Sequence, residues 1–154
     1  MNLIKSLLHN VGVVIVGFGF AFLGRTVDSL LRISEFHSIF ALSAGCLFVS
    51  VGFVIRVWAT FLFYERQMKV IKLAPQKKLI SSGPYRFSRN PLYLGGNFFI
   101  FLGSVLFLGS PSGVILTAIN LVAVDFMIRR EERQLARDFG DEWLLYRNRV
   151  RRWL

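Results

Sequence analysis

The sequence contains little cysteine, little histidine and few acidic residues. Among its 154 residues are one cysteine, two histidines and nine acidic side chains, against 19 lysines and arginines. The lone cysteine, Cys46, excludes a disulfide framework and a cysteine metal cluster, so we interpret it as a small buried hydrophobe and expect no bound metal. The shortage of acid leaves a formal net charge of +10. Such a balance points to nucleic acid or to an anionic membrane surface.

Charge is also absent from three long runs of the chain. Residues 6–24, 36–55 and 92–124 contain no Asp, Glu, Lys or Arg. The chain is 54% hydrophobic, with a mean hydropathy of +0.52. A soluble domain of this size could not bury so much apolar surface. Because a helix needs about 17–25 apolar residues to cross the hydrocarbon core, these runs predict membrane-spanning helices.

The third run is long enough for two helices. Its middle carries GSPSG at 109–113, and proline flanked by serine and glycine is typical of a tight turn. The sequence therefore predicts an all-α integral membrane protein, a single membrane domain over 1–154, whose last two spans form a helical hairpin. The four predicted transmembrane helices cover 6–24, 37–60, 92–109 and 112–128.

The basic residues gather in a loop over 64–91 and in a tail over 129–154. The first loop has two arginines balanced by two acids, whereas the later loop has seven basic residues and the tail eight. The positive-inside rule places both basic segments and both termini in the cytoplasm. Topology and attraction to anionic headgroups account for the charge, so we expect membrane lipids as partners and no nucleic acid.

The tail carries a helical pattern of its own. Its apolar residues recur every three or four positions, which is one face of a helix. They are Leu135, Phe139, Trp143, Tyr146, Val150 and Trp153. Gly140 and Asp141 can divide this amphipathic helix into two pieces. We expect it to lie on the membrane surface or over the cytosolic ends of the spans.

The predicted hairpin brings two polar segments together at the cytosolic membrane face. Its spans have nearly equal length, so RFSRNPLY at 86–93 meets DFMIRREERQL at 125–135. The side chains that meet are Tyr85, Arg86, Arg89, Asn90, Tyr93, Arg129, Arg130, Glu131 and Glu132. Arginines and tyrosines are also common at the ends of ordinary spans. These residues alone therefore leave both a functional site and a plain membrane boundary open.

Three motifs resemble a known family. They are GPYRFSRNPLYLGG at 83–96, EERQLARDFGDEWLLYRNRVRRW at 131–153 and RVWA at 56–59. At these motifs the chain resembles the isoprenylcysteine carboxyl methyltransferase and phospholipid methyltransferase superfamily. Its members carry Gly-Pro-Tyr, then Arg-His-Pro-x-Tyr-x-Gly, a helical hairpin, Glu-Glu, Phe-Gly and a Tyr before a basic end. The resemblance implies an integral membrane methyltransferase. In such enzymes S-adenosylmethionine binds on the cytosolic side and the lipidic acceptor enters from the bilayer.

The resemblance also implies roles for individual residues. The predicted cofactor-binding residues are Gly83, Pro84, Tyr85, Asn90, Pro91, Tyr93, Gly95 and Glu131, and the predicted catalytic residues are Arg89, Glu132 and Arg129. Asn90 departs from the pattern, because the family often has His there. Asn keeps a hydrogen-bonding side chain but cannot titrate, which excludes an acid or base role and leaves a role in holding the cofactor.

The chemistry of the cofactor agrees with these assignments. Either Glu131 or Glu132 can pair with its ammonium group, and an arginine or Asn90 with its carboxylate. A carboxylate acceptor needs no base, because it is already deprotonated; it needs only an arginine that orients it. Arg89 and Arg129 are the candidates for that role. An amine acceptor must lose a proton, which would make the second glutamate or Tyr85 the base.

The leading hypothesis is therefore O-methylation of an isoprenylcysteine-type carboxylate, with a prenylated or otherwise lipid-like small molecule as acceptor. N-methylation of a phospholipid amine remains open. Two further alternatives are a nicotinamide-dependent membrane reductase, for which the chain is short, and a non-catalytic membrane scaffold, to which the Asn90 departure gives weight.

Two ionisable residues, Arg56 and Asp125, fall late in predicted spans, where charge is costly and usually paired. One hypothesis pairs them with each other or with the Arg129 side of the site. The alternative is that Arg56 reaches the cytosolic face and Asp125 binds Arg129 one turn on. We expect both histidines, His9 and His37, to lie far from the site.

Overall fold

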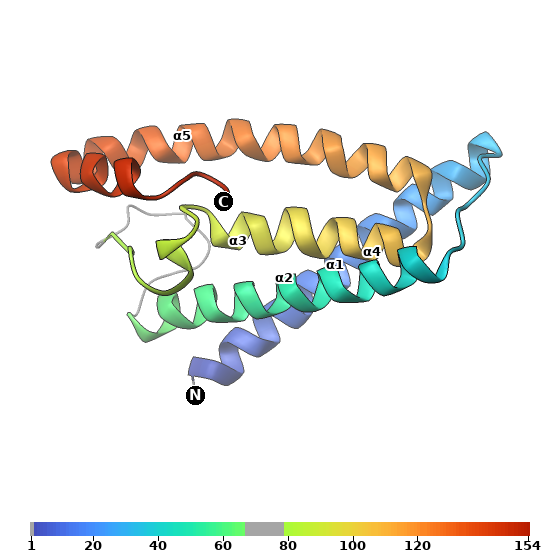
Figure 1. Cartoon of the computed structure of the whole chain (residues 1–154), viewed down its shortest axis with the longest axis horizontal. Coiled ribbons are helices and arrows are strands. Elements are labelled where there is room, and N and C mark those ends of the chain that lie inside the picture. The colour runs from blue at the N-terminus through green and yellow to red at the C-terminus, as the bar shows by residue number, and fades with distance from the viewer. Residues whose placement is uncertain (1, 67–78) are drawn as a thin grey trace.

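The computed structural model describes residues 2–66 and 79–154, which form helices joined by short connections (Figure 1). Helices α1 (Asn2–Leu31) and α2 (Ile39–Glu65) come first, and a 3-10 turn, η1 (Gly83–Arg86), follows. The segments α3 (Pro91–Tyr93), η2 (Leu94–Ile100) and α4 (Phe101–Leu108) make one continuous helix, and α5 (Pro111–Arg149) completes the fold. Four helices in these ranges are long and apolar enough to cross a membrane, which confirms the predicted all-α class.

The helices extend beyond the predicted spans. α1 has 30 residues and α5 has 39, so α5 continues through the predicted boundary at residue 128 into the tail. Residues 129–139 include four Arg and two Glu, which are good helix formers, so the helix continues as far as the break at Gly140. Where the membrane ends along α5 thus remains a prediction. The predicted loop over 64–91 includes residues 67–78, which lie outside the described residues.

Gly140 reverses the direction of α5. Its φ of 50° and ψ of −122° are not helical, and they belong to a region of backbone conformation that glycine adopts readily. After this residue the chain folds back, so the last turns and the C-terminal residues return over the loop that contains η1 (Figure 1). The predicted break at Gly140 and Asp141 is confirmed. Of the two expected positions for the second piece, the one over the ends of the helices is observed.

Small residues allow α2 to pack closely against the α3–α4 helix. A Cβ atom added at Gly52 would lie 2.5 Å from the Gly95 carbonyl oxygen, and one at Gly45 would lie 2.7 Å from the Gly103 carbonyl oxygen. Such close backbone approach is typical of helix pairs in membranes. α1 crosses this pair at an angle (Figure 1).

A buried carboxylate joins the far ends of α1 and α5. Asp28 is fully buried and accepts hydrogen bonds from the Ser110 hydroxyl at 2.5 Å and the Ser112 amide at 2.9 Å. The Ser110 hydroxyl also accepts from the Gly113 amide at 2.9 Å, which caps the start of α5. These bonds hold the bundle together at the end opposite to the η1 loop.

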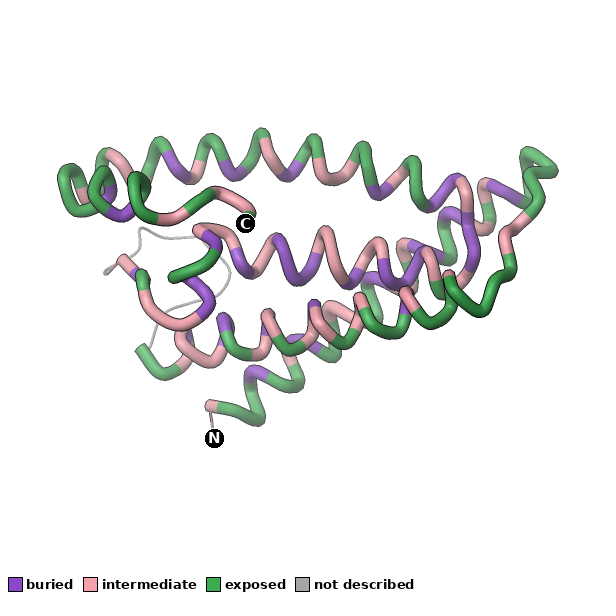
Figure 2. The backbone as a smooth tube through the Cα atoms, in the orientation of Figure 1, coloured by how far each residue is buried: buried purple, intermediate pink, exposed green. Residues whose placement is uncertain are grey.

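Many residues on the outer faces of the long helices are exposed (Figure 2), and large apolar residues are among them. Ile15 is 67% exposed, Phe40 83%, Ile119 60% and Phe126 64%. Apolar surface of this extent marks contact with lipid rather than water. Together with the four long apolar helices, it is the arrangement of an integral membrane protein.

Candidate active site

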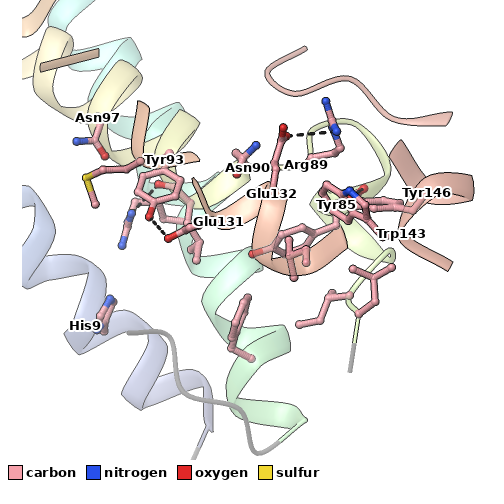
Figure 3. Close-up of a pocket in the computed structure, with 17 residues that line it drawn as sticks. His9, Tyr85, Arg89, Asn90, Tyr93, Asn97, Glu131, Glu132, Trp143 and Tyr146 are labelled. Atoms are coloured by element: carbon pink, nitrogen blue, oxygen red, sulfur yellow. Dashed lines mark hydrogen bonds and ion pairs between the residues drawn. The ribbon is translucent and has the colours of Figure 1, made fainter. Parts of the chain in front are cut away.

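A cavity of about 380 Å³ opens where the first third of α1, the end of α2, the η1 loop, the start of the α3–α4 helix and α5 converge. Figure 3 shows the polar side chains that these elements contribute, with Glu131 beside Tyr93 and Glu132 beside Arg89. Its charged and polar lining consists of His9, Arg56, Tyr85, Arg89, Asn90, Tyr93, Asn97, Glu131, Glu132, Trp143 and Tyr146. Apolar side chains from the same elements, among them Phe63, Leu92 and Met127, complete the wall.

The η1 loop places Tyr85 on one side of the cavity. Gly83 begins the turn with a φ of +60°, and Pro84 and Tyr85 are buried against the end of α2. The Tyr85 ring packs beside Phe63, and its backbone carbonyl accepts a hydrogen bond from the Tyr146 hydroxyl at 2.8 Å. Burial raises the pKa of Tyr85 well above its usual value, with the nearby Tyr146 adding to the effect. Its hydroxyl therefore stays protonated at neutral pH.

Glu132 of α5 holds two arginines. Its Oε1 atom lies 3.3 Å from Nη1 of Arg89, and its Oε2 atom accepts from Nη2 of Arg152 at 2.8 Å. Burial lowers the pKa of Arg89 and Glu132 opposes that shift, but the guanidinium keeps its charge at neutral pH. The hydrogen bonds from Arg152 to Glu132 raise the pKa of Arg152. Trp143 covers Arg89 on another side, with the guanidinium carbon 5.6 Å from its ring centroid.

Residues 150–154 form a strap across the loop that follows η1. The Arg89 amide donates to the Arg151 carbonyl at 2.9 Å, and Nδ2 of Asn90 donates to the Arg152 carbonyl at 3.2 Å. The Ser88 hydroxyl donates to that same carbonyl at 3.2 Å. The Asn90 side chain thus binds the returning end of the chain and lines the cavity at the same time.

A second carboxylate, Glu131, lies on the cavity wall beside Tyr93. The Tyr93 hydroxyl donates a hydrogen bond to its Oε1 atom at 2.7 Å, as Figure 3 shows. Glu132 is paired with two arginines, whereas Glu131 binds a tyrosine. The two neighbouring glutamates therefore face different surroundings.

The match to a protein-family model covers residues 40–142 and is to the phospholipid methyltransferase family. The chain belongs to that family. Comparison with curated proteins finds no match, and comparison with solved structures finds none either. The matched region includes α2, the η1 loop, the α3–α4 helix and most of α5, so it contains nearly every element that lines the cavity.

Not all of the site residues predicted from the resemblance to membrane methyltransferases line the cavity. Six do: Tyr85, Arg89, Asn90, Tyr93, Glu131 and Glu132. Four others shape the walls: Gly83 packs on Leu62 and Trp58, Pro84 is buried in η1, Pro91 is buried at the start of α3, and Gly95 packs on α2.

Arg129 lies elsewhere. It is bound to Asp125 at 2.7 Å, with its side chain 53% exposed, and it lines a separate groove of about 690 Å³. The structure thus places this predicted catalytic residue apart from the other two, Arg89 and Glu132.

Several residues that line the cavity were not predicted as site residues, and one expectation was wrong. His9 was expected far from the site, yet it lines the cavity. The topology signal could have found it, because the same positive-inside argument places the N-terminus and the basic loop on one side. Trp143 and Tyr146 were recognised only as a helix face, and their burial at 2% and 8% depends on the reversal at Gly140. Asn97 carried no signal in the sequence.

Arg56 and Asp125 do not pair. Asp125 binds Arg129 one turn on, as the second interpretation expected, and also Arg152 at 3.5 Å. Arg56 does not reach the surface: it is 8% exposed, and its bonds go to Asn10 on α1 and to the Leu92 carbonyl. The burial of Arg56 depends on its partner Asn10 on α1, and the position of α1 beside α2 could not be predicted from the sequence.

The residues present fit S-adenosylmethionine, the methyl donor that the resemblance implies. The cavity volume of about 380 Å³ falls in the range of small-molecule pockets, about 300–1,000 Å³. Glu131 offers a carboxylate for an ammonium group, and Tyr85 and Trp143 offer aromatic surfaces for a nucleobase. Among the described residues, the buried Nε atom of Arg89 has no hydrogen-bond partner, and its Nη1 atom has only the ion-pair contact with Glu132 at 3.3 Å. Buried donors of this kind are rare without an acceptor, and a ligand can supply one.

Proposed function

We propose that this protein transfers a methyl group from S-adenosylmethionine to a lipid-like acceptor at the cytosolic face of the membrane, as O-methylation of an isoprenylcysteine-type carboxylate. The observation that carries the proposal is a polar cavity, walled by Arg89, Glu131 and aromatic side chains, in a member of a methyltransferase family. The cavity lies within a bundle whose outer surface is apolar. A water-soluble donor and a membrane-borne acceptor can meet in such a place.

The bound cofactor supplies an electrophilic methyl group on a sulfonium ion, and the residues of the chain provide position and a water-poor surrounding. Glu131 binds the ammonium group. The rings of Tyr85 and Trp143 enclose the nucleoside. Arg89, buried and oriented by its ion pair with Glu132, binds the acceptor carboxylate through its Nε–H group, which has no partner among the described residues. Holding both reactants in line without competing water supplies most of the rate in a displacement of this kind.

The lining favours a carboxylate acceptor over an amine. An amine must lose a proton, and the two predicted bases suit that task poorly. Glu132 is engaged by two arginines. Tyr85 has a pKa raised by burial, which makes it a hydrogen-bond donor at neutral pH and not a base. Phospholipid N-methylation remains the second candidate because Glu131 lines the same cavity and could accept the proton.

The separate groove near Arg129 offers the acceptor a path from the bilayer. It lies between η2 and α5, and its wall is apolar apart from Asp125 and Arg129. The apolar lining includes Leu94, Phe98, Leu121, Val122, Phe126, Trp153 and Leu154. Leu94 follows Tyr93 of the cavity wall directly, so the groove and the cavity approach each other across one turn of helix. The lipid part of the acceptor would occupy the groove while its polar end reaches Arg89.

The cytosolic orientation is part of this proposal. The sequence rule that supports it counts lysines and arginines, and these concentrate in the 64–91 loop and in the tail. The described residues of both segments, 64–66, 79–91 and 129–154, lie at the end of the bundle that holds the cavity. Cysteine-accessibility labelling of single-cysteine variants in intact cells would test this orientation.

The experiment that tests the proposed function is binding of S-adenosylhomocysteine to the detergent-purified protein, by calorimetry. We expect micromolar binding that Glu131→Gln weakens at least tenfold, since it removes a charge-assisted contact to the ammonium group. Glu142→Gln, on an exposed side chain of α5, is the matched control and should bind as the wild type does. No binding by folded wild type in several detergents would refute the proposal.

A further inference from the structure

The cavity wall contains a buried cation that the proposed chemistry does not use. Arg56 lies two thirds of the way along α2, is 8% exposed and lines the cavity. Its Nε atom donates to Oδ1 of Asn10 at 2.8 Å, and its Nη1 atom donates to the Leu92 carbonyl at 2.6 Å. Both acceptors are neutral. Among residues 2–66 and 79–154, no partner accepts a hydrogen bond from its Nη2 atom.

No carboxylate of the chain neutralises this guanidinium. The nine acidic residues all lie within the described ranges, and none forms an ion pair with Arg56. The sequence of residues 67–78 contains no Asp or Glu. A charge withdrawn from water and left without a counter-charge is costly, and an ionisable residue within a membrane helix is by default a candidate for function.

The backbone around Arg56 is shaped to admit its side chain. A Cβ atom added at Gly95 would lie 2.7 Å from Cγ of Arg56, and one at Gly96 would lie 2.7 Å from Nη1. Both glycines belong to η2, where the helix widens into a π-helical turn, a feature often found at functional sites. The side chain therefore runs along a groove in the neighbouring helix and is held in one direction.

We propose that Arg56 binds the carboxylate of a ligand in the cavity, and that this carboxylate belongs to the amino-acid end of the cofactor. The proposal rests on the proposed function and deepens it. Glu131 lines the same cavity and offers the opposite charge. The cofactor carries its ammonium group and its carboxylate on the same carbon. The ammonium group would then bind Glu131 on α5, and the carboxylate would bind Arg56 on α2.

A purely structural role for Arg56 is the competing interpretation. Its two hydrogen bonds tie α1 and the start of the α3–α4 helix to α2, and removal of the side chain would loosen that junction. A structural arginine would affect folding and all ligands alike. A carboxylate-binding arginine would affect only ligands that carry a carboxylate.

The test compares two ligands that differ by that group: S-adenosylhomocysteine and its decarboxylated analogue S-adenosyl-3-thiopropylamine. We expect wild type to bind the first at least tenfold more tightly, the loss typical of a hydrogen bond to a charged group. Arg56→Gln should remove this preference while it leaves affinity for the amine analogue nearly unchanged. Arg25→Gln, which removes an arginine bound to Glu35 at the other end of α1, is the control and should keep the preference.

A second variant guards against misfolding of Arg56→Gln. Asn10→Asp keeps Arg56 and gives its Nε atom a carboxylate partner from the chain itself. If Arg56 binds the ligand carboxylate, this internal counter-charge should reduce the preference at least threefold. If both Asn10→Asp and Arg56→Gln keep the preference for S-adenosylhomocysteine over its amine analogue, Arg56 does not bind the cofactor carboxylate.

The carboxylate that Arg56 binds can also belong to the acceptor, and a second measurement distinguishes the acceptor from the cofactor. If the preference persists but Arg56→Gln raises KM for N-acetyl-S-farnesylcysteine at least tenfold, Arg56 binds the acceptor carboxylate. If neither quantity changes, the proposal is wrong, although binding of S-adenosylhomocysteine would still support the proposed function. If wild type binds no S-adenosylhomocysteine, both fail.

Discussion

Glu132 joins the cavity to the C-terminal strap, and replacing it with alanine should release both. In the folded protein its carboxylate lies between Arg89 at 3.3 Å and Arg152 at 2.8 Å. Glu132→Ala would leave two guanidinium groups in the same buried region with no shared counter-charge. The strap would lose its closest side-chain anchor and keep the longer contact between Arg152 and Asp125 and the bonds to its carbonyls from the loop.

The size of the effect follows from burial. Removing one partner of a buried ion pair costs about 3–5 kcal/mol. The side chains of Arg89 and Glu132 are 9% and 11% exposed, but that of Arg152 is 26% exposed, so water can solvate it in part. We therefore expect Glu132→Ala to lower the unfolding free energy by about 2–4 kcal/mol. Glu132→Gln keeps the shape and one acceptor oxygen, and it should lose less.

Two measurements check this prediction. The first is unfolding in mixed detergent micelles, where the midpoint gives the change in stability. The second is limited trypsin digestion, because Arg149, Arg151 and Arg152 offer cleavage sites that become more accessible if the strap detaches. Glu142→Ala is the matched control, since Glu142 is an exposed glutamate of the same helix. Unchanged stability together with unchanged cleavage in Glu132→Ala would refute the reasoning.

This expectation also changes how Glu132 should be used to probe the cofactor. Loss of ligand binding in Glu132→Ala would follow from a displaced Arg89 as readily as from a lost contact. Glu131 is the better probe because it lines the cavity and binds the Tyr93 hydroxyl, whereas Glu132 also holds Arg89 in place. A loss in Glu131→Gln with unchanged stability would then report on the ligand.

Two further predictions concern the bundle away from the cavity. Gly52→Ala should destabilise by about 1–3 kcal/mol through overpacking, because its Cβ would lie 2.5 Å from a backbone oxygen. Gly19→Ala, with nothing within 4 Å, is its control in thermal unfolding, and equal effects would contradict the packing argument. Asp28→Ala should cost about 1–3 kcal/mol by leaving the Ser110 hydroxyl and Ser112 amide without their acceptor. Because Asp28 lies at the far end, affinity of the folded protein for S-adenosylhomocysteine should not change, and a tenfold loss would contradict this view.

The family assignment narrows the classes of function that the sequence left open. Membership of the phospholipid methyltransferase family favours a methyltransferase over a nicotinamide-dependent reductase. The name of the family does not decide between carboxylate and amine acceptors. That choice depends on the protonation chemistry of the cavity, where the structure places one carboxylate between arginines and the other beside a tyrosine.

The sequence alone predicted the features that arise from local pattern. Long uncharged runs predicted four apolar helices, because the cost of charge in lipid confines Lys, Arg, Asp and Glu to their ends. GSPSG predicted the turn before α5, and Gly140 predicted its reversal. The motif at 83–96 and the Glu131–Glu132 pair predicted the residues that meet in the cavity, because a hairpin of equal arms brings its ends together.

Only the tertiary structure decided which of these residues face the cavity. Arg89 and Arg129 look alike in the sequence, yet one lies buried beside Glu132 and the other lies half exposed on Asp125. The angle at which α1 crosses the bundle brings His9 and Asn10 to the site, and no periodicity in an apolar helix encodes such a contact. The role of Arg56 likewise depends on neighbours from α1 and η2. Side-chain environment arises from contacts between distant segments, and it decides whether a charge is paired by the chain or left for a ligand.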